Sequence, residues 1–445
     1  MNATSIASVY GRRVWDSRGR PTVEAEVTLS GGARGRAIAP AGASTGSGEA
    51  LDLRDGGPAF NGLDVRKAQA NISSEITSAL RGKDATDQAA VDKILLALDG
   101  TPNKRRIGGN AMIAASMAVA HAAANARGVP LWHSLSNGKP GRLPLPEIQI
   151  FGGGAHAARR VDVQDFMVVC PRAKSFAEAL DITAQVYAAA GKLLEERGLL
   201  QGVADEGGYW PAFTSNEEAL DMLMRAIEHA GFVPSDDVAI SLDIAASSFG
   251  QSGRYRLALE GRELDSDGLI DMLGQWIARY PIVSVEDPVA EDDAGAFRRF
   301  TKAYGARVQV VGDDFLVTDA ARVRGAAAAG AVTAALIKPN QAGTLTETLS
   351  ALTAARDTGL TTIISARSGE TEDITIVHLA VGWDAGQLKV GSFARSERMA
   401  KWNEALRIEE ALGQRARFAG GAALGVRGVM NNQGLYSKVE FGHFK

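Results

Sequence analysis

Cysteine is almost absent from this chain. Cys170 is the single cysteine among 445 residues, so no disulfide can form within one chain. Disulfides are typical of secreted proteins, and a chain without them is typical of a reducing compartment. The first eight residues also lack the basic and apolar segments of a secretory signal peptide. We therefore expect a cytoplasmic protein.

A strong charge imbalance and long hydrophobic runs are lacking as well. The formal net charge is −4 at pH 7, which gives no electrostatic reason to bind nucleic acid or an anionic membrane. The most apolar stretch, residues 111–126, contains His121 and Asn125 and is shorter than the ~20 residues of a membrane-spanning helix. We expect neither nucleic acid nor a membrane as a partner.

Glycine-rich segments are present, but neither of the two most prominent has the pattern of a nucleotide-binding loop. Residues 41–48 lack the Gly-Lys-Ser/Thr ending of a P-loop, and the three adjacent glycines at 152–154 do not match the dinucleotide-binding fingerprint. The first segment has the composition of a mobile loop that folds over a ligand, or of a plain surface turn.

Eight short apolar runs in the later part of the chain each lead to a charged residue. The charged residues are Asp165, Glu206, Asp243, Glu286, Asp313, Lys338, Arg367 and Lys389. The spacing between them leaves room each time for a strand, a helix and two loops, which is the rhythm of parallel β/α units. We predict a closed eight-stranded β/α barrel whose mouth collects these side chains.

The part before the barrel has a different pattern. Residues 9–29 alternate as a β-hairpin does, and helical patterns follow over residues 65–80, 86–98 and 111–126. Pro144 and Pro146 mark the passage to the barrel. The fold class is α/β, and the predicted parts are an N-terminal α+β domain at 1–142, a β/α barrel at 143–420 and a glycine-rich C-terminal tail at 421–445.

Three of the predicted mouth carboxylates, Asp243, Glu286 and Asp313, come from successive strands. Three carboxylates so close together need a cation to stay ionised, and oxygen ligands without histidine or thiolate favour Mg²⁺. Asp287 and Asp314 are rival ligands, and turn formation is the alternative role for any one of these acids.

Lys338, Arg367 and Lys389 face the acids across the predicted mouth. Such a site suits a small substrate that carries both a carboxylate and a phosphate. Burial or nearby cations would lower the pKa of Lys338 until it acts as a base near neutrality, unless it is a solvated or salt-bridged lysine. With Glu206 as the acid, the chemistry is removal of the proton α to a carboxylate, followed by loss of water.

Several motifs carry a resemblance to a known family. They are Asp16-Ser17-Arg18-Gly19, Pro21-Thr22-Val23-Glu24, Gly42-Ala43-Ser44-Thr45-Gly46, Asp205-Glu206-Gly207-Gly208, Gly312-Asp313-Asp314 and residues 367–373. The chain resembles enolase up to about residue 420. The resemblance implies an enolase-type barrel, a homodimer and two Mg²⁺ ions.

The resemblance also implies a role for each residue of the site. Asp243, Glu286 and Asp313 would bind the first Mg²⁺, and Ser44 together with the substrate would form the second site. Lys338 would be the base and Glu206 the acid. The positions implied to bind substrate are His156, Asp165, Ala366, Arg367, Ser368 and Lys389.

Two of these positions depart from the family. Ala366 stands where enolases have a histidine, and Asp165 where they have a glutamate; both positions lie near the leaving hydroxyl in the family's site. The smaller side chains favour a divergent paralogue that acts on 2-phosphoglycerate or phosphoenolpyruvate and binds a second anion in the vacated space. Such an enzyme resembles carboxyphosphonoenolpyruvate synthase of phosphonate antibiotic biosynthesis, whose second substrate is phosphonoformate. The alternatives are a phosphopyruvate hydratase, the glycolytic enolase, and a non-catalytic binding protein with the enolase fold.

Overall fold

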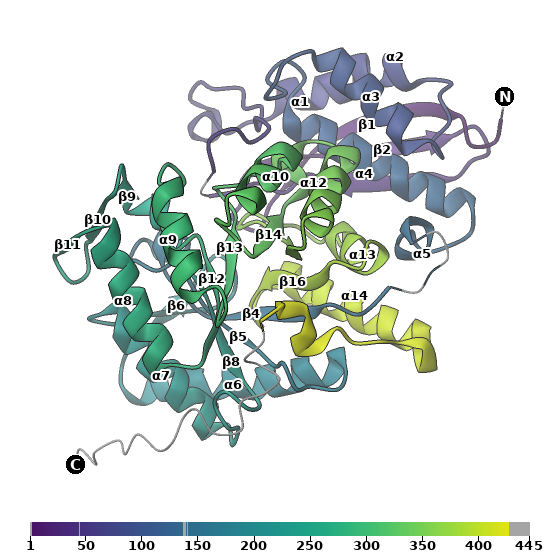
Figure 1. Ribbon diagram of the computed structural model, residues 1–445. Helices are drawn as coiled ribbons and strands as arrows, with labels where there is room; N and C mark the ends of the chain where they lie inside the picture. The colour runs from purple at the N-terminus through teal and green to yellow at the C-terminus, as the bar shows by residue number, and fades with distance from the viewer. Residues whose placement is uncertain (1, 44, 137–138, 140, 427–445) are drawn as a thin grey trace.

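The computed structural model describes residues 2–43, 45–136, 139 and 141–426. It has two parts, an N-terminal α+β domain and a larger β/α barrel, as the sequence predicts (Figure 1). In Figure 1 the N-terminal domain, in purple and blue, lies along one side of the barrel.

The N-terminal domain is built on a three-stranded antiparallel sheet. Its strands are β1 (Ile6–Trp15), β2 (Pro21–Leu29) and β3 (Arg34–Ile38). The predicted hairpin is formed by β1 and β2 and turns at Gly19, whose φ of 69° favours glycine. Pairing of β3 with β2 completes the sheet.

The helices of this domain pack on the sheet and on one another. They are η1 (Ala59–Gly62), α1 (Arg66–Asn71), the π-helical η2 (Ile72–Ile76), α2 (Thr77–Leu80), α3 (Gln88–Asp99), α4 (Gly109–Ala126) and α5 (Leu131–Leu135). The alanine-rich α4 lies directly on β2 and β3. A Cβ atom added at Gly35 would lie 2.1 Å from the backbone nitrogen of Ala122. Small side chains are therefore required at this contact. The helices predicted over residues 65–80, 86–98 and 111–126 are confirmed.

Eight strands form the closed barrel. They are β4 (Leu145–Gly152), β5 (Asp165–Val169), β8 (Ala239–Asp243), β12 (Ile282–Glu286), β13 (Gln309–Gly312), β14 (Ala334–Ile337), β15 (Thr361–Ser365) and β16 (Gly386–Gly391). Pairing of β16 with β4 closes the ring. Neighbouring strands are parallel except at β5, which runs antiparallel to both β4 and β8.

Three details of the predicted barrel are wrong. The run that leads to Glu206 forms β6 (Leu200–Val203), which lies outside the ring and pairs with β7 (Tyr209–Pro211). The first barrel strand, β4, was missed because Glu147 and Gln149 interrupt its apolar pattern. Asp165 begins its strand instead of ending it, but because β5 is antiparallel, its first residue lies at the same mouth.

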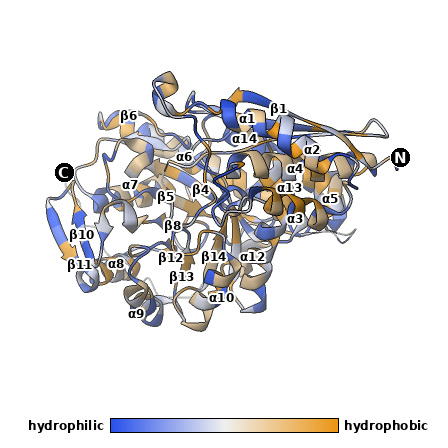
Figure 2. Ribbon diagram, turned by 90° about the horizontal axis from the view of Figure 1, so that it is seen from above, coloured by the Kyte–Doolittle hydropathy of each residue, from blue (hydrophilic) through white to orange (hydrophobic). Residues whose placement is uncertain are grey.

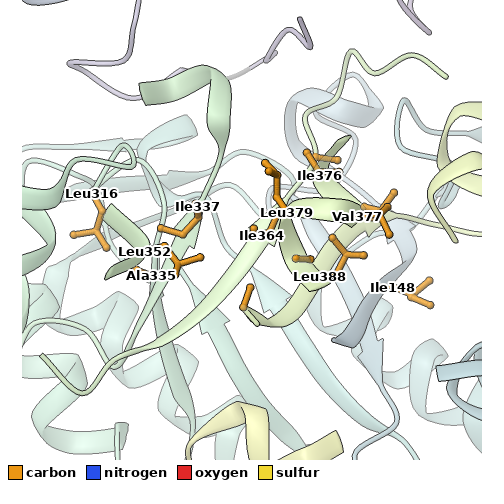
Figure 3. Close-up of a cluster of buried hydrophobic side chains, with 14 of the residues drawn as sticks. Ile148, Leu316, Ala335, Ile337, Leu352, Ile364, Ile376, Val377, Leu379 and Leu388 are labelled. Atoms are coloured by element: carbon orange, nitrogen blue, oxygen red, sulfur yellow. The ribbon is translucent and has the colours of Figure 1, made fainter. Parts of the chain in front are cut away.

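Helices surround the barrel. They are α6 (Phe176–Glu196), α7 (Asn216–His229), α8 (Ser266–Arg279), α9 (Ala294–Tyr304), α10 (Ala320–Ala328), α11 (Pro339–Ala342), α12 (Leu345–Asp357), α13 (Thr375–Gly382) and α14 (Ser396–Leu412). Of these, α6, α7, α8, α12, α13 and α14 pack directly against its strands. Figure 3 shows one part of this layer, in which Ile337, Ile364 and Leu388 of the strands lie near Leu352 and Leu379 of the helices.

Several of these helices begin at a side-chain cap. The hydroxyl oxygens of Ser175 and Thr344 accept hydrogen bonds from the backbone nitrogens of Glu178 and Glu347 at the starts of α6 and α12. A serine or threonine followed three residues later by glutamate is the capping-box pattern. Each cap stabilises its helix by about 1 kcal/mol. The Thr344 cap also fixes where the loop that follows β14 at the barrel mouth ends, whereas the Ser175 cap lies at the opposite end of the barrel, because β5 is antiparallel.

The end of the barrel opposite the mouth is closed by an apolar plug. It contains Leu145, Val169 and Ala239 of the strands together with Ala423 and Leu424 of η6 (Gly420–Leu424). The predicted tail, 421–445, therefore begins within this turn, and its residues 427–445 lie outside the described residues. The boundaries drawn at 142 and 420 stay predictions.

Smaller elements complete the chain. A second three-stranded sheet comprises β9 (Gly250–Gln251), β10 (Arg254–Leu257) and β11 (Arg262–Asp265), and short 3-10 helices occur at η3 (Gly154–Ala157), η4 (Ala246–Ser248) and η5 (Gly413–Arg415). In Figure 2 hydrophobic colours gather on the barrel strands, while β10 is mainly hydrophilic. Within the described ranges, none of the helices combines the length and apolar character needed to cross a bilayer.

Candidate active site

The three predicted metal ligands lie side by side at the barrel mouth. Asp243 and Glu286 are the last residues of β8 and β12 and are direct partners in the strand register. Asp313 follows the next strand, β13, by one residue. All three carboxylates are buried. The three acids thus come from neighbouring strands at the mouth. Their role as ligands of one ion stays a prediction, because the described carboxylates whose oxygens lie within 4.8 Å of one another are those of Asp287, Asp313 and Asp314.

Two lysines balance the charge of these acids. The Nζ atom of Lys389 lies 2.8 Å from Asp243 and 2.9 Å from Glu286, and Lys338 pairs with Asp313. Burial and the neighbouring Asp243 carboxylate raise the pKa of Glu286 well above its usual range. Its Oε1 atom is buried and has no hydrogen-bond partner among the described residues. An orphaned carboxylate oxygen beside two further carboxylates fits a hard divalent cation.

Asp287 and Asp314, the rival ligands, are placed differently. The two carboxylate oxygens of Asp287 accept hydrogen bonds from the backbone nitrogens of Asp313 and Asp314, at 2.9 and 2.8 Å. Asp287 thus shapes the turn that presents Asp313. Burial and the Asp313 carboxylate raise the pKa of Asp314 to about 7. The geometry favours Asp313 over its neighbours as a group facing the mouth.

Lys338 lies at the mouth, directly after β14, as predicted. The expected lowering of its pKa is wrong for this arrangement. Burial and the nearby Arg367 and Lys389 act to lower the pKa, but the paired Asp313 carboxylate outweighs them and raises it. Gln341 donates a hydrogen bond to the other oxygen of Asp313 at 3.0 Å, which fixes the carboxylate toward the lysine.

His156, Asp165 and Glu206 form a second buried group. The imidazole stands between the two acids, with Nδ1 3.4 Å from Asp165 and Nε2 3.8 Å from Glu206. Burial works against a charged imidazole, but the two carboxylates outweigh it and raise the pKa of His156. The pKa of Asp165 is lowered although burial opposes this, because Lys389 and His156 lie close by. A histidine held between two acids can hold and pass a proton.

Arg367 and Ser368 follow β15 and are held by residues that sequence reasoning left without a role. The guanidinium of Arg367 contacts Glu49 and the side-chain oxygen of Asn340, both at 3.0 Å. Arg18 donates to the hydroxyl oxygen of Ser368 at 3.1 Å. Arg18 lies in one of the motifs that carried the resemblance, which was the available signal for it.

One cavity at the mouth unites most of the predicted site. It is lined by His156, Asp165, Glu206, Asp243, Lys338, Ala366, Arg367, Ser368 and Lys389, together with Ala43, Gln164 and Ser365. Glu286 and Asp313 do not line the cavity, but they pair with Lys389 and Lys338, which do. Ser44, the predicted second metal ligand, lies outside the described residues. The cavity of about 20 Å³ holds little more than one water molecule, so a larger ligand requires the groups around it to move.

Two glutamines near the site were also missed. Gln164 donates to Asp243 at 3.0 Å, and Gln149 bonds to Asp165. Both amides are buried. Gln149 could have been noticed as a polar residue within an apolar segment. The same polar residue interrupts the apolar pattern, so strand β4 was not predicted.

Comparison with known proteins identifies the family of this chain. The model of the enolase C-terminal TIM barrel domain matches residues 141–425, and that of the enolase N-terminal domain matches residues 6–135. The chain is 46% identical over 436 residues to Enolase 1 of Desulfitobacterium hafniense (strain Y51), an alignment that covers 97% of this chain and 100% of the relative. The chain belongs to the enolase family of lyases.

Proposed function

We propose that this protein is a Mg²⁺-dependent phosphopyruvate hydratase, which converts 2-phosphoglycerate into phosphoenolpyruvate and water. The observation that carries the proposal is that Lys338 and Glu206 line one cavity together with Arg367, Ser368 and Lys389. The family is Mg²⁺-dependent and acts on small phosphorylated anions, and the similarity to Enolase 1 supports this reaction over a more specialised one.

The residues of the mouth divide the reaction between them. In its unprotonated form, Lys338 Nζ takes the proton from C2 of the substrate, and Glu206 in its protonated form gives a proton to the hydroxyl that leaves C3 as water. Arg367 and Ser368 bind the phosphate, and Lys389 binds the carboxylate. These steps conserve atoms and charge without an oxidant or reductant.

Asp243, Glu286 and Asp313 would hold the first Mg²⁺. When bound, the ion supplies positive charge that stabilises the dianion formed at the substrate carboxylate. The unpartnered Oε1 atom of Glu286 supports this assignment. A second ion would bind with the substrate and Ser44.

Formation of phosphoenolpyruvate from 2-phosphoglycerate, followed by ultraviolet absorbance with saturating Mg²⁺, tests the proposal. We expect turnover at the rate typical of metabolic enzymes, about 1–10³ per second. The Lys338→Ala variant serves as the inactive control. Absence of turnover in the unaltered protein, with the fold intact by circular dichroism, would refute the proposal and favour a binding protein with the enolase fold.

A second candidate is the specialised paralogue that also uses phosphonoformate. Asp165 and Ala366, the two positions with smaller side chains than the family pattern, both line the cavity and favour it. Phosphorus NMR of 2-phosphoglycerate with and without phosphonoformate distinguishes the two. A new phosphorus resonance only when both compounds are present would select the synthase, whereas simple inhibition by phosphonoformate would select the hydratase.

We further expect a cytoplasmic homodimer. The side chains of Tyr10, Trp15 and Phe60 are 53%, 49% and 42% exposed, and Trp15 and Phe60 contact each other edge to face. Exposed aromatic groups on one domain are suited to burial by a second copy. Light scattering coupled to size exclusion measures the oligomer, and a monomer at micromolar concentration would contradict the expectation.

A further inference from the structure

Strand β4 carries two polar side chains into the barrel. Ile148 and Ile150 belong to the main core cluster, while Glu147 and Gln149 alternate with them and are each only 1% exposed. Barrel interiors are usually filled by branched apolar residues. A buried amide is costly unless its hydrogen bonds are made, so the contacts of Gln149 require explanation.

Both ends of the Gln149 amide are used. Its nitrogen donates to Oδ1 of Asp165, and its oxygen accepts from the backbone nitrogen of Gly208 at 2.8 Å. A carboxylate only accepts and a backbone N–H only donates, so the orientation of the amide is fixed. Gln149 therefore joins strand β5 to the turn after β6, which carries Glu206.

The residues around this bridge pack closely against it. A Cβ atom added at Gly208 would lie 2.4 Å from the amide oxygen of Gln149, so a larger residue at 208 would displace the Gln149 side chain. Gln149 holds Oδ1 of Asp165 near His156, at 3.4 Å from Nδ1, while Oδ2 lies 3.5 Å from Lys389. One amide thus orients the aspartate and sets its separation from Glu206.

We propose that Gln149 is a positioning residue for the elimination step. It acts through Asp165 and through the turn that carries Glu206, and it keeps both in register with the leaving hydroxyl. The inference rests on the proposed function. Within the described residues, the Gln149 amide bonds to Asp165 and Gly208 and not to Lys338, so it bears on loss of the hydroxyl and not on removal of the C2 proton.

Two reactions measured on one enzyme separate these steps. Exchange of the C2 proton of 2-phosphoglycerate with deuterated solvent reports on Lys338, and phosphoenolpyruvate formation reports on the whole reaction. For Gln149→Met we expect dehydration to fall at least tenfold while exchange falls less than threefold. The matched control is Gln387→Met, another buried barrel glutamine, which bonds to the backbone oxygen of Ala423 in the plug and should leave both rates unchanged.

Two compensating changes in side-chain length distinguish loss of this contact from loss of folding. Gln149→Asn shortens the amide by one methylene, and Asp165→Glu lengthens the carboxylate by one. Each alone misplaces the contact and should lower dehydration, whereas the double variant restores the combined reach and should recover most of it. Recovery in the double variant supports the bridge, and additive losses overturn it.

The possible results discriminate between the two proposals. Equal loss of exchange and dehydration in Gln149→Met, or loss of neither, overturns the positioning role while the hydratase stands. If the unaltered protein catalyses neither reaction, the hydratase proposal falls, and the role of Gln149 falls with it.

Discussion

The two sides of the barrel mouth are built in different ways. The base side comprises Asp313, Lys338 and Arg367, which follow the three consecutive parallel strands β13, β14 and β15. The hydroxyl side comprises His156, Asp165 and Glu206. Of these only Asp165 lies on a barrel strand, whereas His156 lies on η3 and Glu206 in the turn between β6 and β7.

The difference shows how each side keeps its geometry. On the base side the hydrogen-bonded ladder of parallel strands fixes where each side chain starts. On the hydroxyl side the backbone is irregular, so side-chain contacts such as those of Gln149 must hold Asp165 and the turn of Glu206 in position. Substitutions on the base side should therefore lower proton exchange and dehydration together. Substitutions on the hydroxyl side should lower dehydration more than proton exchange.

Removal of Mg²⁺ should have the largest effect, because it disables both sides together. Chelation by EDTA should abolish exchange and dehydration, and added Mg²⁺ should restore them. In Glu286→Gln, loss of one carboxylate charge should weaken Mg²⁺ binding by about tenfold or more, read from activity against free Mg²⁺. Full turnover in excess EDTA would show that the buried acids at 243, 286 and 313 do not act through a metal.

Lys338→Ala should have the second-largest effect, because it removes the proposed base and leaves the hydroxyl side unchanged. Removing a general base costs about 10²- to 10⁴-fold, and here exchange and dehydration should fall equally. The matched control is Lys104→Ala, which removes another partly buried lysine, paired with Glu347 at 2.8 Å in a different region. If exchange persists in Lys338→Ala, another group removes the proton.

Glu206→Gln should impair the hydroxyl side and leave the base side intact. Dehydration should fall by about 10²-fold because the leaving hydroxyl lacks its proton donor, while exchange by Lys338 continues. Asp205→Asn, at the adjacent acid that does not line the cavity, is the control. Equal loss of both reactions would mean that Glu206 serves proton removal, and the division of the mouth into two sides would be wrong.

The same difference explains what the sequence could predict. Lys338 and the acids at 243, 286 and 313 end regular apolar runs, so periodicity alone located them and the barrel that carries them. Glu206 follows an apolar run too, but that run is a hairpin strand outside the ring, because short apolar segments do not reveal their pairing partners. Its place at the mouth was predicted for the wrong structural reason.

Contacts between distant segments could not be predicted from periodicity. Pairing of Lys338 with Asp313 reverses the expected direction of the lysine pKa, and that pairing depends on side-chain distances. Glu49 and Asn340 reach Arg367 from separate parts of the chain. Local sequence holds no signal for such contacts, whereas the resemblance to a family supplied residue roles directly.

His156 offers a test of the hydroxyl side by pH. Glu206 and Asp165 raise the pKa of His156, so its imidazole should stay protonated above the ordinary value near 6.5. The stability that the protonated imidazole contributes is therefore present below pH 6.5 and is lost as the pH rises through the pKa of the folded state. Nitrogen NMR should show this protonation, and Asp165→Asn should lower the pKa. His378, whose pKa burial and His121 lower to about 4, is an internal reference with the opposite shift. A His156 that titrates below 6.5 would contradict the placement.

Ala366→His should have the smallest effect. The change returns the residue typical of enolases, but the described cavity of about 20 Å³ leaves no room for an imidazole unless neighbouring groups move. We expect dehydration of 2-phosphoglycerate to change less than about tenfold, or 1.4 kcal/mol, with exchange unchanged. Ala366→Leu, of similar bulk without ring nitrogens, separates volume from hydrogen bonding. A larger gain in dehydration, with loss of phosphonoformate binding by calorimetry, would mean that the hydroxyl side had been adapted to a second anion and that the base side alone retains the family's chemistry.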